Sequence, residues 1–273
     1  MCEPKCTNPV YANRAEYLLS GWQGNLAGRI IQRLSEIPHR TYVEPFAGAG
    51  GVFLRRPWRS RAEVINDIST DVVTLFRVLQ RHYVPLMDML RWQLTSRAEF
   101  ERLVNAVPNT LTDLERAARF LYGQRVAFGG KVSGRNFGVS PRTSARFDVQ
   151  SLGKVLEDVH ERLSGVVIER LPYADLIRRY DWPETLFYLD PPYWGGEKDY
   201  GPGVFSRDDY RLLAEQLAGI QGQFLLSLND VPAVRETFAA FDLTPVETTY
   251  SIGSKRTGRP RAGELFITAQ RRS

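Results

Sequence analysis

The hydrophobic and polar positions near the start of the chain predict helices and strands in alternation. Apolar spacing typical of a helix covers residues 11–38, and an extended run follows at residues 41–46. The run ends in a glycine-rich turn, after which the pattern predicts a helix before the loop at residues 55–61. Residues 62–67 read as a second strand, and a further helix is expected from Ser69. This order is typical of the beginning of a doubly wound α/β sheet.

Sheet character returns in the C-terminal part of the chain. Near-continuous apolar runs, typical of strands buried in a parallel sheet, lie at residues 166–170, 185–189 and 223–228. Ser206 and Asp209 have capping-box spacing at the start of an amphipathic helix. Residues 243–251 and 264–268 are the last strand candidates, and we expect them to pair antiparallel at the sheet edge.

The stretch between these two sheet regions has a different pattern, of helices and loops. Two pairs have the spacing of a capping box: Ser96 with Glu99, and Thr112 with Glu115. Residues 129–141 combine glycine, serine and basic side chains, which is typical of a hairpin or a loop. The sequence therefore predicts a mostly helical domain at residues 76–164, inserted into an α/β domain made of residues 1–75 and 165–273.

Positive charge is concentrated in two segments that contain no acidic residue. The net charge of the 273 residues is +5, yet residues 116–147 alone carry more than that. The basic side chains of this first segment are Arg116, Arg119, Arg125, Lys131, Arg135, Arg142 and Arg146. Those of the second segment are Lys255, Arg256, Arg259 and Arg261. Arginine mixed with aromatic residues and glycine suits a nucleic-acid backbone and exposed bases, whereas the ordinary alternative is a solvated face or loop.

Several other classes of protein and site are not supported. No apolar run approaches the roughly 18 residues of a membrane span, and the polar residues 1–9 do not resemble a secretory signal. The two cysteines, Cys2 and Cys6, lie in that tail, as expected for free thiols in a cytoplasmic protein. No metal site is expected, because no metal-ligand spacing relates the three histidines, which are His39, His82 and His160.

A glycine-rich motif follows the first predicted strand and suits a small ligand. Residues 44–51 read Glu-Pro-Phe-Ala-Gly-Ala-Gly-Gly, in which glycines let backbone N–H groups and the start of the next helix approach a ligand. The full dinucleotide fingerprint and the lysine of a nucleoside-triphosphate loop are both missing. Asp67 ends the next strand, where a carboxylate can accept hydrogen bonds from a ribose. A nucleoside without a phosphate chain is therefore expected, and an ordinary tight turn is the alternative.

The second motif is Asp190-Pro191-Pro192-Tyr193, directly after the apolar run at residues 185–189. Prolines have no backbone N–H, but their carbonyl oxygens remain free acceptors. A carboxylate, a fixed carbonyl and an aromatic ring at a strand end can accept both hydrogens of an exocyclic amine and stack on its ring. The position of the motif after a buried strand favours this interpretation over a chance turn.

With these two motifs in this order, the chain resembles DNA adenine-N6 methyltransferases that use S-adenosylmethionine, and in particular their Dam-like group. In that group a target-recognition domain separates the glycine motif from the Asp-Pro-Pro-Tyr motif, which suits the long interval between Gly48 and Asp190. Weaker matches extend the resemblance over about residues 15–268; they lie at residues 66–68, 116–122, 173–175, 226–230, 250–252 and 263–265.

The resemblance implies a Rossmann-like α/β sheet of seven strands with an inserted, mostly helical target-recognition domain. It assigns S-adenosylmethionine to Trp22, Gly24, Asn25, Glu44, Phe46, Ala47, Gly48, Gly50, Asp67, Asp175 and Asp190. The target adenine is expected to flip into a pocket made by Asp190, Pro191, Pro192 and Tyr193. Contacts to double-stranded DNA are expected from Arg125, Lys131, Arg135, Asn136, Lys255 and Arg256. The resemblance further implies a site-specific, cytoplasmic enzyme of a bacterium or phage, monomeric in solution.

Two segments depart from the family pattern. The N-terminal family motif, aromatic-x-Gly-Gly/Asn-Lys, reads Trp22-Gln-Gly-Asn25 and then Leu26, so the lysine is missing; Arg29 lies about one turn later. The recognition hairpin, at residues 128–141, also differs, so the target sequence does not transfer. The alternatives are adenine-N6 methylation of RNA, and a DNA-binding protein with a decayed cofactor site. The intact glycine and Asp-Pro-Pro-Tyr motifs argue against decay.

Overall fold

The computed structural model describes residues 24–126, 147–197, 203–246 and 263–270. The chain forms two compact units. The first, which we name the sheet unit, contains residues 23–47, 60–68 and 171–273. The second, the helical unit, contains residues 48–59 and 69–170.

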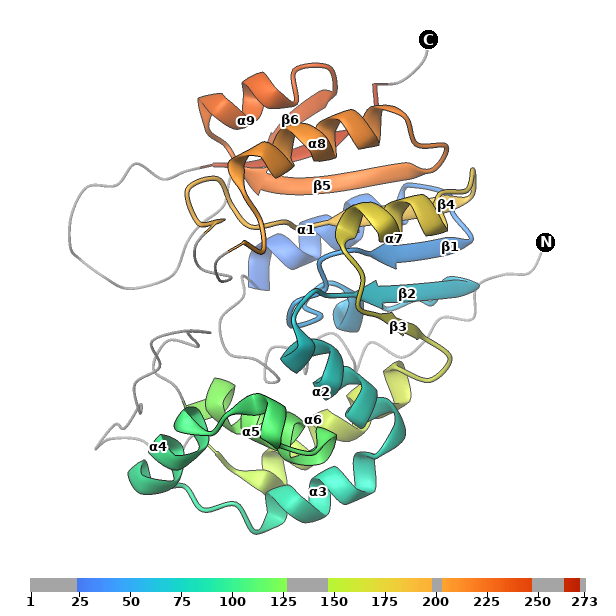
Figure 1. Ribbon diagram of the computed structural model, residues 1–273. Helices are drawn as coiled ribbons and strands as arrows, with labels where there is room; N and C mark the ends of the chain where they lie inside the picture. The colour runs from blue at the N-terminus through green and yellow to red at the C-terminus, as the bar shows by residue number, and fades with distance from the viewer. Residues whose placement is uncertain (1–23, 127–146, 198–202, 247–262, 271–273) are drawn as a thin grey trace. The chain divides into compact units, whose positions relative to one another are not determined.

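Seven strands form one sheet in the order β3-β2-β1-β4-β5-β7-β6 (Figure 1). They are β1 Thr41–Glu44, β2 Ala62–Asn66, β3 Val167–Glu169, β4 Thr185–Leu189, β5 Gln223–Asn229, β6 Asp242–Val246 and β7 Glu264–Thr268. Strands β2, β1, β4 and β5 pair in parallel, and β7 pairs antiparallel with β5 and β6. The α/β sheet of seven strands and its antiparallel edge pair are therefore confirmed. The strand order reverses between β1 and β4, and ligands of open α/β sheets bind outside the carboxyl ends of strands at such a point.

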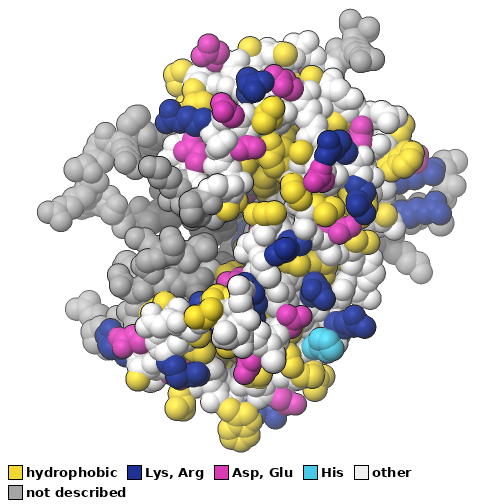
Figure 2. Space-filling view, in the orientation of Figure 1, with side chains coloured by type: hydrophobic (Ala, Val, Ile, Leu, Met, Phe, Trp, Pro, Cys, Tyr) yellow, Lys and Arg dark blue, Asp and Glu magenta, His cyan; other side chains and the backbone are white. Residues whose placement is uncertain are grey.

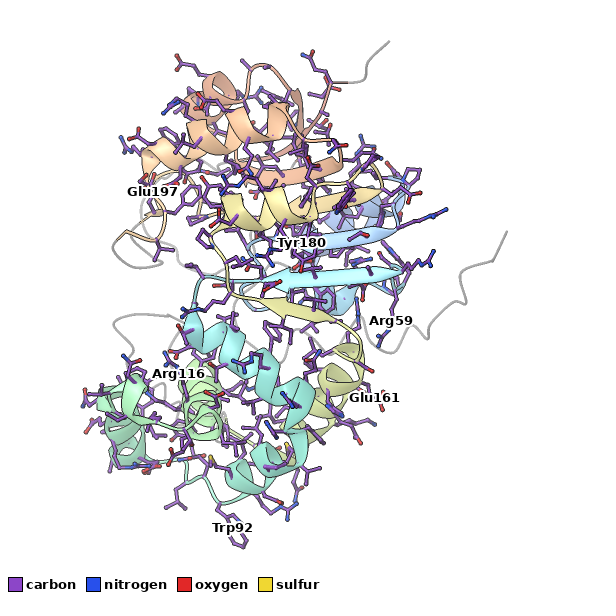
Figure 3. The ribbon with its side chains drawn as sticks, turned by 45° about the vertical axis from the view of Figure 1, so that its right-hand side comes forward. Arg59, Trp92, Arg116, Glu161, Tyr180 and Glu197 are labelled. Atoms are coloured by element: carbon purple, nitrogen blue, oxygen red, sulfur yellow. The ribbon has the colours of Figure 1, made fainter. Side chains whose placement is uncertain are left out.

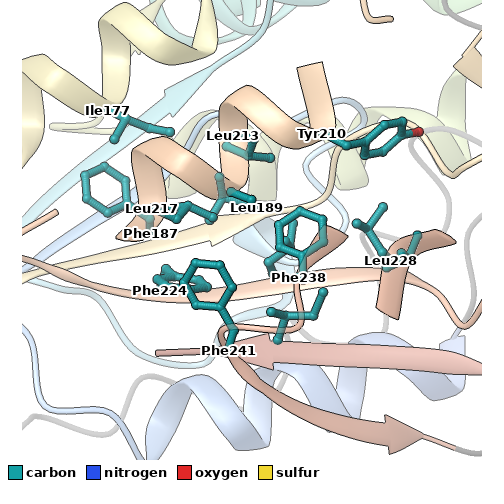
Figure 4. Packing of buried hydrophobic residues seen from close by; sticks show 14 of the residues in the cluster. Ile177, Phe187, Leu189, Tyr210, Leu213, Leu217, Phe224, Leu228, Phe238 and Phe241 are labelled. Atoms are coloured by element: carbon teal, nitrogen blue, oxygen red, sulfur yellow. The ribbon is translucent and has the colours of Figure 1, made fainter. Parts of the chain in front are cut away.

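The sheet unit has a core that anchors the two central strands β4 and β5. Its helices are α1 Gly24–Ser35, α7 Tyr173–Tyr180, α8 Arg207–Ala218 and α9 Pro232–Thr237. Every residue of β4 is buried, as the continuous apolar run predicts. Phe187 of β4 and Phe224 of β5 share one apolar cluster with Leu213 and Leu217 of α8 and with Phe238 (Figure 4). Each such side chain contributes about 1.5–3 kcal/mol on burial, so the strand that leads to Asp190 is firmly held.

The described part of the helical unit consists mainly of short helices. Its helices are η3 Phe53–Arg55, α2 Thr70–Arg81, α3 Tyr83–Arg91, α4 Arg97–Asn105, η4 Pro108–Thr110, α5 Asp113–Val126 and α6 Val149–Arg162, and its residue range also includes the edge strand β3. The predicted box at Thr112 and Glu115 forms, because each backbone N–H donates to the other side chain. Ser96 caps α4, but the Glu99 carboxylate binds Gln93 and Arg102, so that box is only half formed.

Two predictions of local structure are wrong. The helix expected after the glycine turn is only the 3₁₀ helix η3. Val52, Phe53 and Leu54 are all buried, and three consecutive buried positions do not fit the single apolar stripe of a surface α-helix. The run at residues 166–170 was expected to be a buried strand. It contains β3, whose residues are exposed or half-buried because the strand lies at the sheet edge. The helix expected over residues 11–38 is described from Gly24 onward, and the strand expected at residues 243–251 is described to Val246.

The described surface mixes charges of both signs. Figure 2 shows Lys and Arg side chains interspersed with Asp and Glu over the face in view. Trp92, which is 81% exposed, points away from the helical unit (Figure 3). Among the described helices, none has both the length and the hydropathy that a membrane crossing requires. The described residues also contain no group of three or more His, Cys, Asp or Glu placed to hold a metal ion.

Candidate active site

Three acidic side chains lie at the edge of the sheet where the parallel strands end. Glu44 is the last residue of β1, Asp190 directly follows β4, and Glu264 is the first residue of β7. Strand β1 pairs with β4, and Glu264 pairs with Asn229 at the end of β5. Because β7 is antiparallel, its start lies at the same edge as the ends of its parallel neighbours. The three carboxyl groups therefore gather near the point where the strand order reverses.

Asp190 is held by a chain of hydroxyl groups. Ser227 Oγ donates to Asp190 Oδ1 at 3.2 Å and lies 3.0 Å from Tyr188 Oη. Since Ser227 uses its hydrogen on Asp190, Tyr188 is the donor of the second bond. Burial raises the pKa of Asp190 well above its usual range, and the nearby charges of Glu264 and Glu44 raise it further, against the lowering effect of Ser227. Asp190 therefore keeps its proton to an unusually high pH until a donor or a positive charge reaches it.

The carbonyl groups of the two prolines that follow Asp190 differ in their hydrogen bonding. Tyr210 Oη donates to the carbonyl oxygen of Pro192 at 2.7 Å. Within the described residues, no hydrogen bond to the Pro191 carbonyl is found. The prediction that both carbonyls are free is therefore wrong for Pro192. The Pro191 carbonyl is the one left to accept a hydrogen bond from a ligand.

The residues after the prolines are fixed by strands β5 and β7. Tyr193 Oη donates to Glu264 Oε1. Trp194 N donates to Asn229 Oδ1 at 2.9 Å, and Asn229 Nδ2 donates back to the Trp194 carbonyl at 3.1 Å. Neither Glu264 nor Asn229 was predicted to be a site residue, because the pattern of their segments indicates only strands. Their side chains nevertheless clamp the end of the segment at residues 190–193.

An aromatic cluster lies beside the carboxyl end of β1. The ring of half-buried Phe46 is 5.4 Å from that of Tyr173 and 5.9 Å from that of Phe205, measured between centroids. Tyr173 and Phe205 are themselves 5.8 Å apart, and Tyr173 Oη donates to Asp209 Oδ1 at 3.1 Å. Flat apolar surfaces of this kind suit the stacking of a base.

Asn66 fixes the backbone next to Asp67. Its Nδ2 donates to the carbonyls of Pro45 at 2.8 Å and Leu171 at 3.1 Å, and its Oδ1 accepts from Leu171 N at 2.7 Å. Ala47 N donates to the Asn66 carbonyl at 2.8 Å. These bonds tie the loop after β1 and Leu171, two residues before α7, to the end of β2. Asp67, half-buried, is therefore placed on a rigid backbone beside the loop that carries Ala47.

The glycine turn itself has a clear conformational requirement. Gly48 and Gly50 have φ angles of +49° and +71°, which L side chains rarely adopt. A Cβ at Gly50 would also lie 3.1 Å from atoms of Leu54 and Phe76. Since η3 replaces the expected helix, no α-helix N-terminus follows the turn directly, and that part of the ligand-binding prediction is wrong.

The family model for the D12 class of N6 adenine-specific DNA methyltransferases matches residues 22–252. The chain belongs to this family. A DNA adenine methylase of Vibrio cholerae is 26% identical over 278 residues, covering 93% of this chain and 95% of that protein. A DNA adenine methylase of Salmonella typhi is 27% identical over 241 residues, with coverage of 84% and 86%. The type II methyltransferase M.CviBI of Paramecium bursaria Chlorella virus NC1A is 20% identical over 233 residues, with coverage of 84% and 89%.

The other residues assigned to the methyltransferase site from the sequence either lie outside the described residues or belong to helices. Outside the described residues are Trp22, Lys131, Arg135, Asn136, Lys255 and Arg256. Gly24 and Asn25 form the start of α1. Asp175 lies in the first turn of α7 and binds Arg178, and half-buried Arg125 lies in the last turn of α5.

Two arginines of the first basic segment, at residues 116–147, form contacts inside the helical unit of this methyltransferase. Arg116 Nε lies 2.5 Å from Asp71 Oδ1, and Arg119 Nη1 lies 3.7 Å from Asp71 Oδ2. Arg119 Nε also donates to the Leu103 carbonyl at 2.7 Å. Arg116 thus joins α5 to α2, from which Asp71 comes (Figure 3). The charge count made from the sequence therefore overstates the number of arginines available to DNA.

Proposed function

We propose that this methyltransferase transfers a methyl group from S-adenosylmethionine to N6 of an adenine held by Asp190, Pro191 and Tyr193. One observation carries the proposal. A carboxylate, a carbonyl that receives no described hydrogen bond, and an aromatic ring lie within four consecutive residues at the point where the strand order reverses. Those groups match the two hydrogens and the ring of an adenine amine.

Residues at the same edge of the sheet suit the proposed cofactor. When bound, S-adenosylmethionine supplies an electrophilic methyl group on a positively charged sulfur. We assign its adenine to the aromatic cluster at Phe46 and its ribose to Asp67. The buried acids Glu44, Asp190 and Glu264 form a region in which a positive charge is favoured, because a nearby positive charge would stabilise the ionised form that burial disfavours at Asp190 and Glu264. We assign Trp22, Gly24, Asn25, Ala47, Gly48, Gly50 and Asp175 to the same ligand, as the resemblance implies.

The amine chemistry follows from the two acceptors. Asp190 and the Pro191 carbonyl would each accept one hydrogen from N6, which draws the nitrogen lone pair out of conjugation with the ring. N6 would then be the nucleophile toward the methyl group of the cofactor, whose bond to sulfur would break as the bond to nitrogen forms and leave a neutral thioether, so no covalent bond between enzyme and substrate is required. The methylated nitrogen must lose one proton, and Asp190, whose pKa burial raises, is placed to accept it. Positioning and electrostatics supply the catalysis.

The substrate is proposed to be double-stranded DNA with the target adenine flipped out of the helix. N6 of a paired adenine is hydrogen-bonded inside the duplex, where no protein side chain can align it for methyl transfer. We propose residues 76–164 as the target-recognition domain. Its basic side chains at Arg125, Lys131 and Arg135, together with Lys255 and Arg256, would contact the duplex.

The substitution of the family lysine by Leu26 has a structural explanation. Leu26 is 2% exposed and belongs to the core, so a lysine at this position would bury a charge in the present packing. Arg29, one turn later on α1, is exposed and provides a positive charge close by. Leu26 therefore serves the core, and we propose that Arg29 supplies the positive charge near the cofactor.

Calorimetric titration with S-adenosylmethionine tests the cofactor assignment. Asp67→Ala should raise the cofactor Kd by about one to two orders of magnitude, because hydrogen bonds to a charged acceptor contribute roughly 1.5–3 kcal/mol. Asp242→Ala, which removes an exposed carboxylate on β6, is the matched control and should leave the Kd unchanged. An unchanged Kd in Asp67→Ala would remove Asp67 from the site, and no binding by the parent protein would overturn the cofactor assignment.

A further inference from the structure

A buried carboxylate outside the two sequence motifs touches the segment at residues 190–193. Glu264 is fully buried, and its Oε1 accepts the hydrogen bond from Tyr193 Oη. Its second oxygen, Oε2, is buried too and has no hydrogen-bond partner among the described residues. An unsatisfied buried oxygen costs about 1–3 kcal/mol, and more when charged. A position that is only structural would be better served by an apolar residue or by glutamine.

The backbone register holds Glu264 against the Tyr193 end of this segment. Glu264 pairs with Asn229 across the β5–β7 ladder. The Asn229 side chain in turn makes two hydrogen bonds with the backbone of Trp194, the residue after Tyr193. The start of β7 therefore fixes the Tyr193 hydroxyl directly and the next peptide through its ladder partner. This leaves little freedom to rotate the Tyr193 ring away from its present plane.

Glu264 is also an electrostatic neighbour of Asp190. The groups that face Asp190 are Ser227 from β5, Glu264 from β7, Glu44 from β1 and Tyr188 from its own strand. After burial, the charge of Glu264 is the largest contribution that raises the pKa of Asp190. Burial raises the pKa of Glu264 itself to about 7, against the hydrogen bond from Tyr193. Two such carboxyls lose their protons in two coupled steps, the second delayed by the charge left by the first.

We propose that Glu264 is a positioning residue of the methyl-transfer site, which orients the Tyr193 ring through Oε1 and presents Oε2 as a second negative group beside Asp190. The inference rests on the proposed roles of Asp190 and Tyr193. It predicts that the Glu264 side chain acts through two separable contacts. One is the hydrogen bond to Tyr193, and the other is the charge felt by Asp190.

Three variants separate these contacts: Glu264→Gln, Tyr193→Phe and Glu264→Ala. Glu264→Gln keeps an oxygen that can accept from Tyr193 but removes the charge. At high pH, Glu264→Gln should retain kcat within about threefold. In a plot of kcat against pH, the acidic limb should move by about one pH unit to lower pH, because Asp190 no longer ionises beside a charged neighbour. Tyr193→Phe and Glu264→Ala both remove the hydrogen bond, and each should lower kcat about 10- to 100-fold with little change in the KM for DNA.

The experiment measures methyl transfer to unmethylated bacterial genomic DNA across pH, with a thermal unfolding curve for each variant. The double variant Tyr193→Phe with Glu264→Ala should be no slower than Glu264→Ala alone, because both remove one shared contact. Glu63→Gln is the matched control: Glu63 is also buried in the sheet unit, but its carboxylate binds Ser60 N, and its kcat profile should equal that of the parent.

The results distinguish this inference from the proposed function. Asp190→Ala is assayed in parallel, and an active Asp190→Ala protein would overturn the assignment of the site itself. A second outcome would overturn only the role of Glu264. In that outcome Asp190→Ala is inactive, the acidic limb of the pH profile of kcat is unmoved in Glu264→Gln, and the losses of kcat in Tyr193→Phe and Glu264→Ala add in the double variant. If Glu264→Ala does not fold, Glu264→Gln decides: an unmoved limb rejects the proposal, and a limb at lower pH supports it.

Discussion

Tyr210 donates its phenolic hydrogen to the carbonyl oxygen of Pro192 at a distance of 2.7 Å. The Tyr210 side chain is fully buried, and its ring centroid lies 4.9 Å from those of Trp194 and Phe205. This contact joins α8 to the segment at residues 190–193. The start of α8 is itself fixed by the capping box that Ser206 and Asp209 form, as the sequence predicts. The helix therefore braces the proposed catalytic segment from outside the sheet and occupies one of its two proline carbonyls.

Tyr210→Phe should destabilise the protein and slow methyl transfer. Removing the hydroxyl leaves the Pro192 carbonyl without its donor, which costs about 1–3 kcal/mol in the free energy of unfolding. We expect kcat to fall several-fold as the segment loses its brace. Tyr83→Phe is the control, since Tyr83 Oη donates to the Gly153 carbonyl within the helical unit. Urea unfolding and steady-state kinetics measure both effects, and a Tyr210→Phe protein as stable and as active as the parent would contradict the bracing role.

Ser227→Ala should move the acidic limb of the kcat profile to higher pH. The hydrogen bond from Ser227 lowers the pKa of Asp190, so its loss raises that pKa and delays ionisation as pH increases. This direction is opposite to the one expected for Glu264→Gln. The pair of profiles therefore tests whether both groups act on Asp190. A limb that moves to lower pH, or does not move, in Ser227→Ala would reject the link between this serine and the ionisation of Asp190.

Asp71→Asn should affect stability and not DNA binding. Its carboxylate pairs with Arg116 and Arg119 between α2 and α5, so losing the charge should cost about 1–3 kcal/mol of unfolding free energy. Neither arginine is expected to contact phosphate, and the slope of DNA affinity against salt should match that of the parent. A slope changed by about one unit or more would show that these arginines do reach DNA.

Alanine variants of Lys131 and Arg135 should weaken DNA binding in different ways. Lys131, a point charge between glycine and valine in the sequence, is expected to contact phosphate. Its loss should therefore lower affinity on every sequence and reduce the salt slope by about one unit. Arg135, between Gly134 and Asn136, is expected to read a base, at a cost of roughly 1–3 kcal/mol on the proper site. Binding is measured against salt on methylatable and scrambled duplexes. If both variants bind as the parent does, the segment at Lys255 and Arg256 becomes the better DNA-contact candidate.

Strongly patterned elements were predictable from the sequence, and contacts made by the tertiary structure were not. The run at residues 185–189 predicted β4 because a strand covered on both faces is continuously apolar. The helix expected after Gly51 fails because local spacing does not reveal that Val52, Phe53 and Leu54 are all buried. Arg116 looked available to DNA since its partner Asp71 is distant in the chain.

The same reason explains what was missed at the site. Asp190 and Tyr193 belong to one short motif, so their chemistry can be inferred from the residues next to them in the sequence. Glu264 lies far along the chain and reaches them only through the antiparallel pairing of β7 with β5. Its signal in the sequence is a single glutamate at the start of an apolar run, which is also common at ordinary strand ends. The pairing of strands, and not the motif, identifies it.

The most direct test of the account is the rate of methyl transfer by Asp190→Ala and Asp190→Asn. Tritium transfer from labelled S-adenosylmethionine to unmethylated DNA is measured in a single turnover, with cofactor and DNA binding measured on the same samples. We predict that Asp190→Ala binds both ligands and folds as the parent does but transfers almost no methyl group, and that Asp190→Asn also loses most of its rate because an amide offers N6 a competing donor. An Asp190→Ala protein that keeps more than about a tenth of the parent rate, a loss under about 1.4 kcal/mol, would contradict the central role of Asp190.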